Sequence, residues 1–531
     1  MTGFSLPSTR ATNLADFRDA ESAAKWLAAQ PQANVAAMLA SLVKQVDAFN
    51  HYEVAARERF KTMEVLRKAI FAVDNDCRRR FENKPLPLAP AERSTLDAVR
   101  RLWRLCAVAY QHCLKSCVDG DAALSAHAAR VAHRVLFCLR VEQLDGYAAA
   151  VEPEPGFWRN LHAVLIAAEG LGVAGEPVED RLLGETSEST VSGQYAMALL
   201  LHLARPFSLT GGQLAAAVRW LARWREQVSI ADGPDQGAKS ISIPLDLSVD
   251  RPIHLSPDPA YLPRWLSLGS VLRKIRRRIE SLDAGESPES LKLGSGLSVE
   301  ACRTLLETLG HHLQHPAPDL NALDSMPTLS IGAGLVNIYH LLGGEGLEDA
   351  LHPASSADNH LSKEQLAVFG HVVREQQAPP EAKLETWRLG RDDGNEWVLL
   401  RPAGAGLSRL SLRGLLAILW QGRCRLAVIA SLEQRADGML RATLNPLPGD
   451  VVPRVAEIRE RVSGKSSRHP AFLLSANEDG QQNLLLPTGM MARATAVRFY
   501  DGVGQALPGL RLVDCLERSG EIEYWRVTAG K

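Results

Sequence analysis

The sequence has almost no net charge and no long apolar run. Its 60 Lys+Arg balance 61 Asp+Glu to a net charge of −1, so the whole molecule has no field that would collect nucleic acid or anionic lipid. The start, residues 1–10, lacks the basic and apolar segments of a signal peptide. The most apolar stretch, 196–204, is far shorter than the roughly 20 residues that span a bilayer. We expect a cytoplasmic protein with no nucleic-acid binding and no membrane insertion.

Cysteine is scarce, with 8 residues scattered through a chain of 531. Cys106, Cys113 and Cys117 recur at i, i+7 and i+11, the spacing of a helix face that packs against a core. We therefore expect buried thiols rather than a metal or redox site. Hydrophobic residues make up 46% and charged residues 23%, which excludes a disordered, collagenous or coiled-coil chain. The length predicts about three domains.

The common catalytic fingerprints are incomplete. Residues 463–466 (SGKS) end like a phosphate-binding P-loop, but Arg459 stands where that motif requires glycine. The Gly-Ala-Gly at 332–334 lacks the third glycine of a dinucleotide site. The run HHLQH at 311–315 has zinc-ligand spacing, but His312 stands where a zinc protease has glutamate, which favours a solvated helix end. We expect a non-enzymatic protein with no metal and no cofactor.

A basic cluster lies on one expected helix. Five of the six positions from 273 to 278 are positively charged: Arg273, Lys274, Arg276, Arg277 and Arg278. These charges wrap more than half way round the helix and form no single stripe. The favoured interpretation is a solvated helix with salt bridges to Glu280 or Asp283. A phosphate or partner contact is the alternative.

Helical periodicity dominates from residue 20 to about residue 228. The expected helices are 34–48, 53–82, 91–118, 121–142 and 155–172, followed by a helical hairpin at 190–228. Pro85, Pro87 and Pro90 must interrupt the chain between the second and third helices. Consecutive antiparallel helices of this kind predict a bundle or an α-solenoid-like region.

The next stretch is expected to be mixed and mainly helical, with linkers. Residues 240–249 alternate like a short strand, and 328–344 indicate a strand followed by a short helix. Helices are expected at 262–283 and 298–313, and a second linker at 352–384 with a helix near 362–376.

After Thr386 the pattern changes to short runs of β-formers. The nine runs are EWVLL, LLAILW, RLAVIASL, MLRATL, AFLLS, NLLLP, TAVRFY, LRLVDCLE and IEYWRV. Four dipeptides suited to hairpin turns separate some of them: Asp437-Gly438, Asp479-Gly480, Asp501-Gly502 and Ser519-Gly520. The fold class is therefore multidomain α + β, a helical N-terminal region followed by a C-terminal antiparallel β-barrel. We expect three domains, at 1–236, 237–385 and 386–531.

Several segments, taken in order, resemble a family of bacterial proteins with a long helical N-terminal region and a C-terminal PilZ-like domain. The segments are RFKTMEVLRKA (59–69), AERSTLDAVRRLWRLCAVAY (91–110), GFWRNLHAVLIAAEGLG (156–172), YAMALLLHLARPFSLTGGQL (195–214), RWLSLGSVLRKI (264–275), GESPESLKLG (285–294) and LLAILWQGRCRLAVIASLEQRADGMLRATL (415–444). The resemblance implies a small β-barrel that binds cyclic di-GMP, a bacterial second messenger.

In PilZ domains the ligand is bound by an R-x-x-x-R stretch before the first strand and by a later [D/N]-x-S-x-x-G turn. Here Arg388 and Arg391 lie near the first position with R-x-x-R spacing. The turn aligns either at 401–406, which keeps only the glycine, or at 409–414, which keeps serine and glycine. The remaining candidate nucleotide-binding residues are Arg401, Gly406, Arg409, Ser411, Arg413 and Gly414. Arginine would bind phosphate and stack on guanine.

The sequence therefore predicts a cytoplasmic signalling or scaffold protein that resembles PilZ-type cyclic di-GMP effectors. Its helical region would bind a protein partner, because a helical array presents a groove for a helix or peptide. One alternative is a helical scaffold with a degenerate barrel that binds protein and no nucleotide. A third is an enzyme whose site is assembled from distant residues.

Overall fold

The chain forms two compact units in the computed structural model. The first contains Met1–Lys84, Leu88–Asp319 and Arg435–Asp437, and the second contains Pro85–Pro87, Leu320–Gln434 and Gly438–Lys531. The structure describes residues 4–31, 34–235, 241–253, 263–316, 327–344, 347, 383–392, 396–420, 423–475, 481–501 and 505–529.

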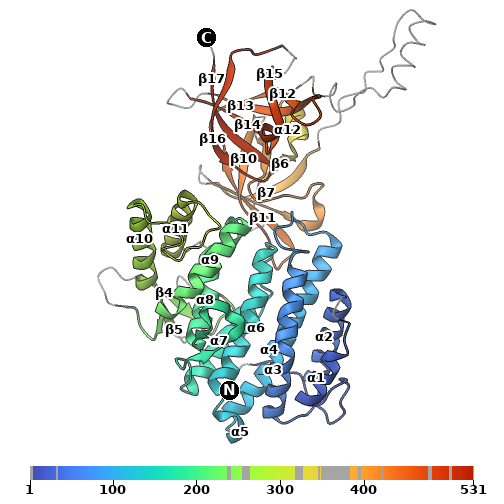
Figure 1. Ribbon diagram of the computed structural model, residues 1–531, viewed down its shortest axis with the longest axis vertical. Helices are drawn as coiled ribbons and strands as arrows, with labels where there is room; N and C mark the ends of the chain where they lie inside the picture. Colours follow the sequence, from blue (N-terminus) through green and yellow to red (C-terminus); the bar gives the residue numbers. More distant parts are fainter. Residues whose placement is uncertain are drawn as a thin grey trace, which may run out of the picture. The chain divides into compact units, whose positions relative to one another are not determined.

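The first unit is mainly helical (Figure 1). Its helices are α1 (Ala20–Ala28), α2 (Val35–Asn50), α3 (Ala56–Arg78), α4 (Pro90–Val118), α5 (Ala122–Ser125), α6 (Ala128–Ala148), α7 (Phe157–Gly170), α8 (Val191–Leu203), α9 (Gly211–Trp224), α10 (Gly269–Asp283) and α11 (Val299–Gln314). The expected helices near 34–48, 53–82, 91–118, 155–172, 190–228 and 298–313 are confirmed, because their apolar residues recur at helical spacing.

Helix α6 is at the centre of the first unit, and every residue from 131 to 143 is buried. Such all-round burial is typical of a helix enclosed by other helices. Arg134 compensates its buried charge by binding the Asp180 carboxylate at 3.0 Å and the Glu64 carboxylate at 3.0 Å. Arg67 reaches the same Asp180 at 2.8 Å. This network ties α3, α6 and the segment before α8 together.

Two sequence expectations for the first unit were wrong in detail. Residues 263–267 form strand β5 (Pro263–Ser267), which pairs with β3 (Ser229–Ala231) and β4 (Ser242–Asp246). Hydrogen bonding to the neighbouring strands therefore makes residues 263–267 a strand, although their apolar spacing suggested a helix over 262–283. The helix begins only at Gly269. The expected helix 121–142 is divided into α5 and α6. A further small sheet joins β1 (Val178–Glu179) to β2 (Glu188–Ser189).

The second unit contains a closed six-stranded antiparallel barrel in the order β10-β11-β8-β7-β6-β9. Its strands are β6 (Thr328–Ala333), β7 (Glu385–Asp392), β8 (Trp397–Pro402), β9 (Leu415–Trp420), β10 (Arg423–Gln434) and β11 (Met439–Pro446). β6 lies before residue 386, where we expected the β domain to begin. It completes the barrel by pairing Ile331 with both Glu385 and Ile418.

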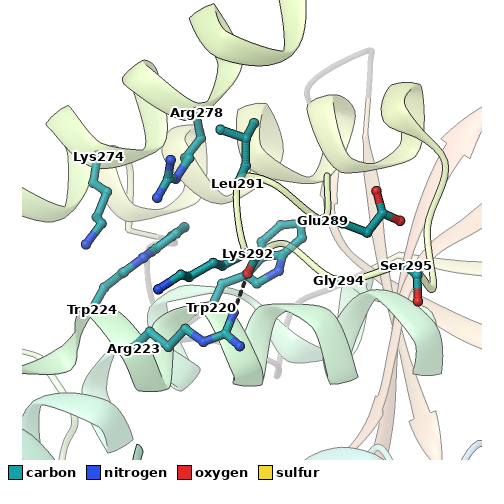
Figure 2. A pocket seen from close by; sticks show the side chains of 10 residues that line it. All are labelled: Trp220, Arg223, Trp224, Lys274, Arg278, Glu289, Leu291, Lys292, Gly294 and Ser295. Carbon is teal, nitrogen blue, oxygen red and sulfur yellow. Dashed lines mark hydrogen bonds between the residues drawn. The ribbon is translucent and has the colours of Figure 1, made fainter. Parts of the chain in front are cut away.

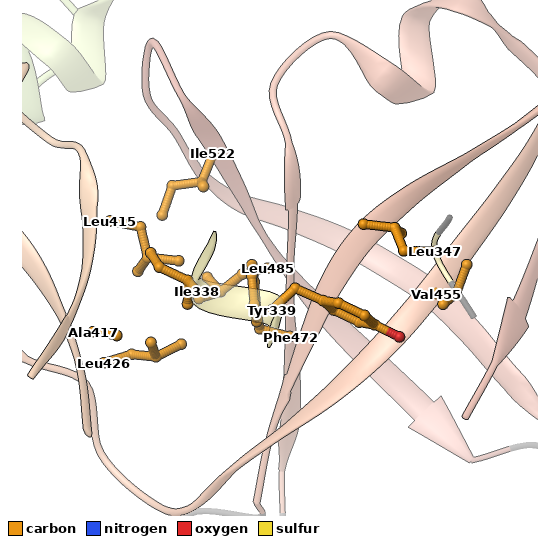
Figure 3. Packing of buried hydrophobic residues seen from close by; sticks show 10 residues of the cluster. All are labelled: Ile338, Tyr339, Leu347, Leu415, Ala417, Leu426, Val455, Phe472, Leu485 and Ile522. Atoms are coloured by element: carbon orange, nitrogen blue, oxygen red, sulfur yellow. The ribbon is translucent and has the colours of Figure 1, made fainter. Parts of the chain in front are cut away.

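A second antiparallel sheet follows the barrel in the order β15-β12-β13-β14-β17-β16. Its strands are β12 (Val451–Glu460), β13 (Ser466–Leu474), β14 (Gln482–Pro487), β15 (Ala494–Tyr500), β16 (Leu510–Arg518) and β17 (Ile522–Ala529), with α15 (Met490–Arg493) before β15. The expected single barrel over 386–531 is therefore a barrel and a separate sheet. Helix α12 (Leu335–Leu341) contributes Ile338 and Tyr339 to a buried cluster with residues of both (Figure 3).

All nine expected β runs are strands, and β7 and β12 are additional strands in the same part of the chain. The turn at Asp437-Gly438 is confirmed, since Gly438 joins β10 to β11 with a φ of 81°. Ser519-Gly520 joins β16 to β17. The turns at 479–480 and 501–502 and the helix near 362–376 lie at least partly outside the described residues. Gly464 of the SGKS run has a φ of 66° in the turn between β12 and β13, so this run is a hairpin connection.

Cys106, Cys113 and Cys117 are buried, as their spacing predicted. Burial raises the pKa of the Cys113 thiol to about 12, and that of Cys117 to about 11. Such thiols are protonated and unreactive at neutral pH. Among the described helices, none is both long and apolar enough to cross a membrane.

Candidate functional site

Arg401, which we expected to contact a nucleotide, is buried in the barrel with 1% of its surface exposed. Its Nε lies 3.2 Å from the Glu385 carboxylate, and its guanidinium carbon lies 4.9 Å from the centre of the Trp387 ring. Its Nη atoms donate to the carbonyl oxygens of Pro402, Ala403 and Ser408 at 3.1, 3.1 and 3.3 Å. Burial lowers the pKa of Arg401, an effect that the Glu385 charge opposes. Arg401 therefore holds the segment after β8 in place.

Glu385 binds the same segment that Arg401 holds. Its Oε1 accepts the backbone N–H groups of Leu407 and Ser408 at 2.9 and 2.7 Å. Gly406 is needed because a Cβ atom there would lie 2.1 Å from the guanidinium carbon of Arg401. A Cβ on Gly414 would lie 2.8 Å from the Glu521 carboxylate. Both glycines thus serve close packing within the second unit.

The other candidate residues are spread over the unit. Arg391 forms an ion pair with Glu396 at 3.3 Å beside the β7–β8 connection. Arg391 pairs with Val398 in the ladder, which places its backbone three residues, or about 10 Å, from Arg401 along β8. Arg388 is exposed on β7. Its backbone pairs with Leu400, next to Arg401, but the Arg388 side chain is exposed whereas the Arg401 side chain is buried.

The 409–414 turn is largely occupied by its own contacts. Arg409 donates to the carbonyl oxygen of Pro85 at 2.8 Å. Ser411 is exposed, and its carbonyl oxygen accepts the Gly414 N–H at 3.0 Å. Arg413 has a φ of 64°, and its backbone N–H binds the Ile429 carbonyl oxygen at 2.9 Å. Among the described residues, the Arg413 side chain has no hydrogen-bond or ion-pair partner.

The first unit contains a cavity that is lined mainly by charged and aromatic side chains. It has a volume of about 860 Å³, within the size range of small-molecule sites. α9, α10 and the segment 289–295 surround it (Figure 2). Its lining residues are Trp220, Arg223, Trp224, Lys274, Arg278, Glu289, Leu291, Lys292, Gly294 and Ser295. We call this cavity the cationic pocket, because four of these residues are positively charged and one is negatively charged.

The local sequence explains how α9 forms one wall of the cationic pocket. Thr210 and Gln213 form a capping box at the start of α9, which fixes where the helix begins. Trp220 and Trp224, four residues apart, lie 99% and 96% buried on the face toward the segment 289–295. The Trp220 indole N–H donates to the Leu293 carbonyl oxygen at 2.9 Å. α9 therefore supplies an indole floor and anchors the opposite wall.

The segment 289–295 requires unusual backbone angles to fit against α9. Lys292 has a φ of 58° and Gly294 a φ of 90°, so the chain turns sharply here. Arg223 of α9 donates to the Lys292 carbonyl oxygen. This contact leaves the Lys292 side chain beside the pocket (Figure 2).

Helix α10 supplies the cationic wall. It buries Val271, Ile275 and Leu282, and it directs Lys274 and Arg278 toward Trp224 and Lys292 (Figure 2). Within the part of the chain that the structure describes, Lys274, Arg278 and Lys292 form no hydrogen bond or ion pair through their side chains. Burial lowers the pKa of Lys274, and the nearby Arg278 charge lowers it further. These positive charges repel one another, and an anion between them would relieve that repulsion.

The sequence had indicated the basic cluster but favoured salt bridges to Glu280 or Asp283. That interpretation was wrong for Asp283, which pairs with Arg303 of α11 at 2.9 Å. Among the described residues Glu280 forms no ion pair with the cluster. Trp220 and Trp224 are buried in the core, and no sequence signal indicated that they also line a cavity together with residues of the basic cluster. They lie about 50 residues before α10, and no local pattern connects them to it.

The chain therefore combines a helical unit, whose cavity is lined by four cationic side chains, with a unit that contains a closed β-barrel. Residues 21–235 match the family model described as the N-terminal domain of the cyclic-di-GMP receptor FimW. The matched range runs from α1 to β3 and includes the α9 wall of the cationic pocket, whereas α10 follows it. No curated protein and no solved structure matched the chain.

Proposed function

We propose that the protein is a cytoplasmic, non-enzymatic effector that binds cyclic di-GMP and transmits its binding state to a protein partner. The observation that carries this proposal is the cationic pocket, in which the side chains of Lys274, Arg278 and Lys292 form no ion pair among the described residues. Support for the particular nucleotide comes from the match of residues 21–235 to a domain of a protein named as a cyclic-di-GMP receptor.

The chemistry of the pocket suits this ligand. Cyclic di-GMP carries two phosphodiester groups and two planar guanines. Arg278 and Lys274 would bind phosphate through charge-assisted hydrogen bonds, and a guanidinium plane is able to stack on a guanine. Trp224 is 4% exposed, so it would act as an apolar floor below the ligand rather than as a free stacking surface.

For the barrel we propose a PilZ-like fold whose arginines have divided roles. Arg401, Gly406 and Gly414 would position the segment between β8 and β9, while Arg388, Arg391, Arg409, Ser411 and Arg413 remain candidates for ligand contact. The second candidate is a barrel that binds protein and no nucleotide. Burial of Arg401 favours it, because a guanidinium held by Glu385 and three carbonyl oxygens is not available to a phosphate.

Isothermal titration calorimetry of the full chain with cyclic di-GMP tests the proposed function. We expect saturable binding with a Kd tighter than about 100 µM, weakened by added salt because the contacts are charged. GMP serves as the single-phosphate comparison. A wild-type chain that gives no heat or saturation with cyclic di-GMP at this concentration would overturn the proposal.

A pair of barrel substitutions distinguishes the two roles of the barrel. Arg388→Ala with Arg413→Ala removes two side chains that are accessible on the barrel and leaves Arg401 in place. If the barrel binds no nucleotide, affinity for cyclic di-GMP stays within about twofold of the wild-type value. A loss of roughly tenfold or more, which is the scale of a lost charge-assisted bond, would assign ligand contacts to the barrel.

A further inference from the structure

A second hollow adjoins the cationic pocket along α10. It has a volume of about 390 Å³ and is lined by Gln227, Ser270, Arg273, Lys274, Arg277 and Arg278. Lys274 and Arg278 line both cavities. These two residues stand one helical turn apart on the same face of α10. The pocket and this α10 hollow therefore share one pair of cations.

The α10 hollow has four cationic side chains and no acidic side chain in its lining. Arg273 donates to the Ser270 hydroxyl at 2.9 Å. Within the described ranges, Arg277 has no hydrogen-bond or ion-pair partner for its side chain. Leu268 at the start of α10 provides no side-chain cap, so the first backbone N–H groups of the helix add to the positive potential beside Ser270.

We propose that the cationic pocket and the α10 hollow form one site with two anion positions, which takes a dinucleotide with two phosphate groups. This inference rests on the proposed function and specifies how its site recognises the ligand. One phosphate lies in the pocket near Lys292, and the other lies in the hollow near Arg273 and Arg277. Lys274 and Arg278 stand between the two phosphates and contact both.

This arrangement predicts a preference for linked phosphates. When one phosphate of a dinucleotide is bound, the second is held close to its own position, so its effective concentration is high. A mononucleotide fills one position and leaves the other set of cations uncompensated. We therefore expect cyclic di-GMP to bind at least about 100-fold more tightly than GMP.

Calorimetry on full-length variants tests the two positions. Arg273→Ala with Arg277→Ala removes the hollow's own cations, and Lys274→Ala with Arg278→Ala removes the shared pair. Arg276→Ala is the matched control, because Arg276 is exposed on the same helix and lines neither cavity. We expect the Arg273/Arg277 variant to bind cyclic di-GMP roughly tenfold or more weakly, and to show a smaller ratio of cyclic di-GMP affinity to GMP affinity. The Lys274/Arg278 variant should lose more affinity for cyclic di-GMP. The Arg276 control should bind as the wild type does.

The outcomes separate this inference from the proposed function. If cyclic di-GMP binds equally well to the Arg273/Arg277 variant and to the Arg276 control, the second anion position is wrong and the proposed function stands. If the wild type binds cyclic di-AMP and not cyclic di-GMP, with the same dependence on the variants, the ligand is wrong and the two-position site stands. If neither cyclic dinucleotide binds, both are overturned. Circular dichroism of each variant establishes that it is folded.

Discussion

The indole N–H of Trp220 donates to the carbonyl oxygen of Leu293 at 2.9 Å. This bond joins the middle of α9 to a segment 73 residues further along the chain. Because the Trp220 side chain is buried, loss of the bond leaves the Leu293 carbonyl oxygen without its partner in a dry environment.

Trp220→Phe should therefore loosen the segment 289–295 and weaken ligand binding. The expected loss of unfolding free energy is about 1–3 kcal/mol from the unpaired carbonyl, measured by urea denaturation. Calorimetry should show weaker binding of cyclic di-GMP. Trp158→Phe is the control, since the Trp158 indole of α7 is buried but makes no hydrogen bond among the described residues. Equal ligand affinities for the two variants would contradict a specific role for the Trp220 bond.

Arg401→Ala should destabilise the second unit without requiring any ligand. The substitution leaves the buried Glu385 carboxylate without its counter-charge, which costs about 3–5 kcal/mol. Thermal unfolding followed by circular dichroism measures the effect. Arg388→Ala removes an exposed arginine of the same barrel and should change stability by less than about 0.5 kcal/mol. Similar melting curves for the two variants would show that Arg401 is not a structural residue.

Gly406→Ala should disturb the same contact through steric overlap. The new methyl group would lie 2.1 Å from the Arg401 guanidinium carbon, so the side chain or the segment must move. We expect destabilisation by about 1–3 kcal/mol. Gly404→Ala, two residues away, is the matched control because a Cβ there meets no atom within 4 Å. The difference between the two melting temperatures is the measurement, and its absence would refute the close approach.

His133 should make the first unit sensitive to acid. Burial and the nearby Arg134 charge together lower its pKa from 6.5 to about 3, although the Asp180 charge opposes this shift. The folded chain thus keeps His133 neutral while the unfolded chain takes up a proton. The stability from this residue is fully present above a pH of about 6.5 and is lost as the pH falls toward 3.

His133→Gln should therefore reduce the pH dependence of unfolding. Between about pH 7.5 and about pH 5, the variant should lose about 2 kcal/mol less unfolding free energy than the wild type. Glutamine keeps a polar group near the Ser189 hydroxyl, which lies 2.7 Å from the His133 Nε2. His311→Gln on the exposed end of α11 is the control. Parallel urea-denaturation profiles for wild type and His133→Gln would contradict this prediction.

Much of the secondary structure followed from local pattern, because apolar spacing reports which face of an element is buried. The strand and helix expected at 328–344 are β6 and α12. The place of β6 in the barrel could not be predicted, because its partner β7 begins at Glu385 and only the closed ladder joins them. For the same reason 263–267 looked helical until its pairing with β3 and β4 was known.

The candidate site was less accessible to sequence reasoning. The sequence alone does not show whether the Arg401 side chain faces solvent or Glu385, because its burial depends on residues of other strands. The basic cluster at 273–278 was visible, but its meaning depended on Trp220, Trp224 and Lys292, which only the tertiary fold brings to it. The sequence pattern therefore identified the charged residues but did not predict which residues pack around them.

The cationic pocket also has a practical consequence for dissecting the protein into fragments. Its indole floor belongs to α9, which ends at Trp224, while its cationic wall and anchored segment extend to Ser295. A fragment that stops at residue 235 or 236, where the matched family model and our expected first domain end, keeps one wall of the cavity and discards the other. Such a piece would expose the largely buried Trp220 and Trp224 to water, which favours aggregation. Binding studies on a shortened chain should therefore carry it through α11, to at least Gln314.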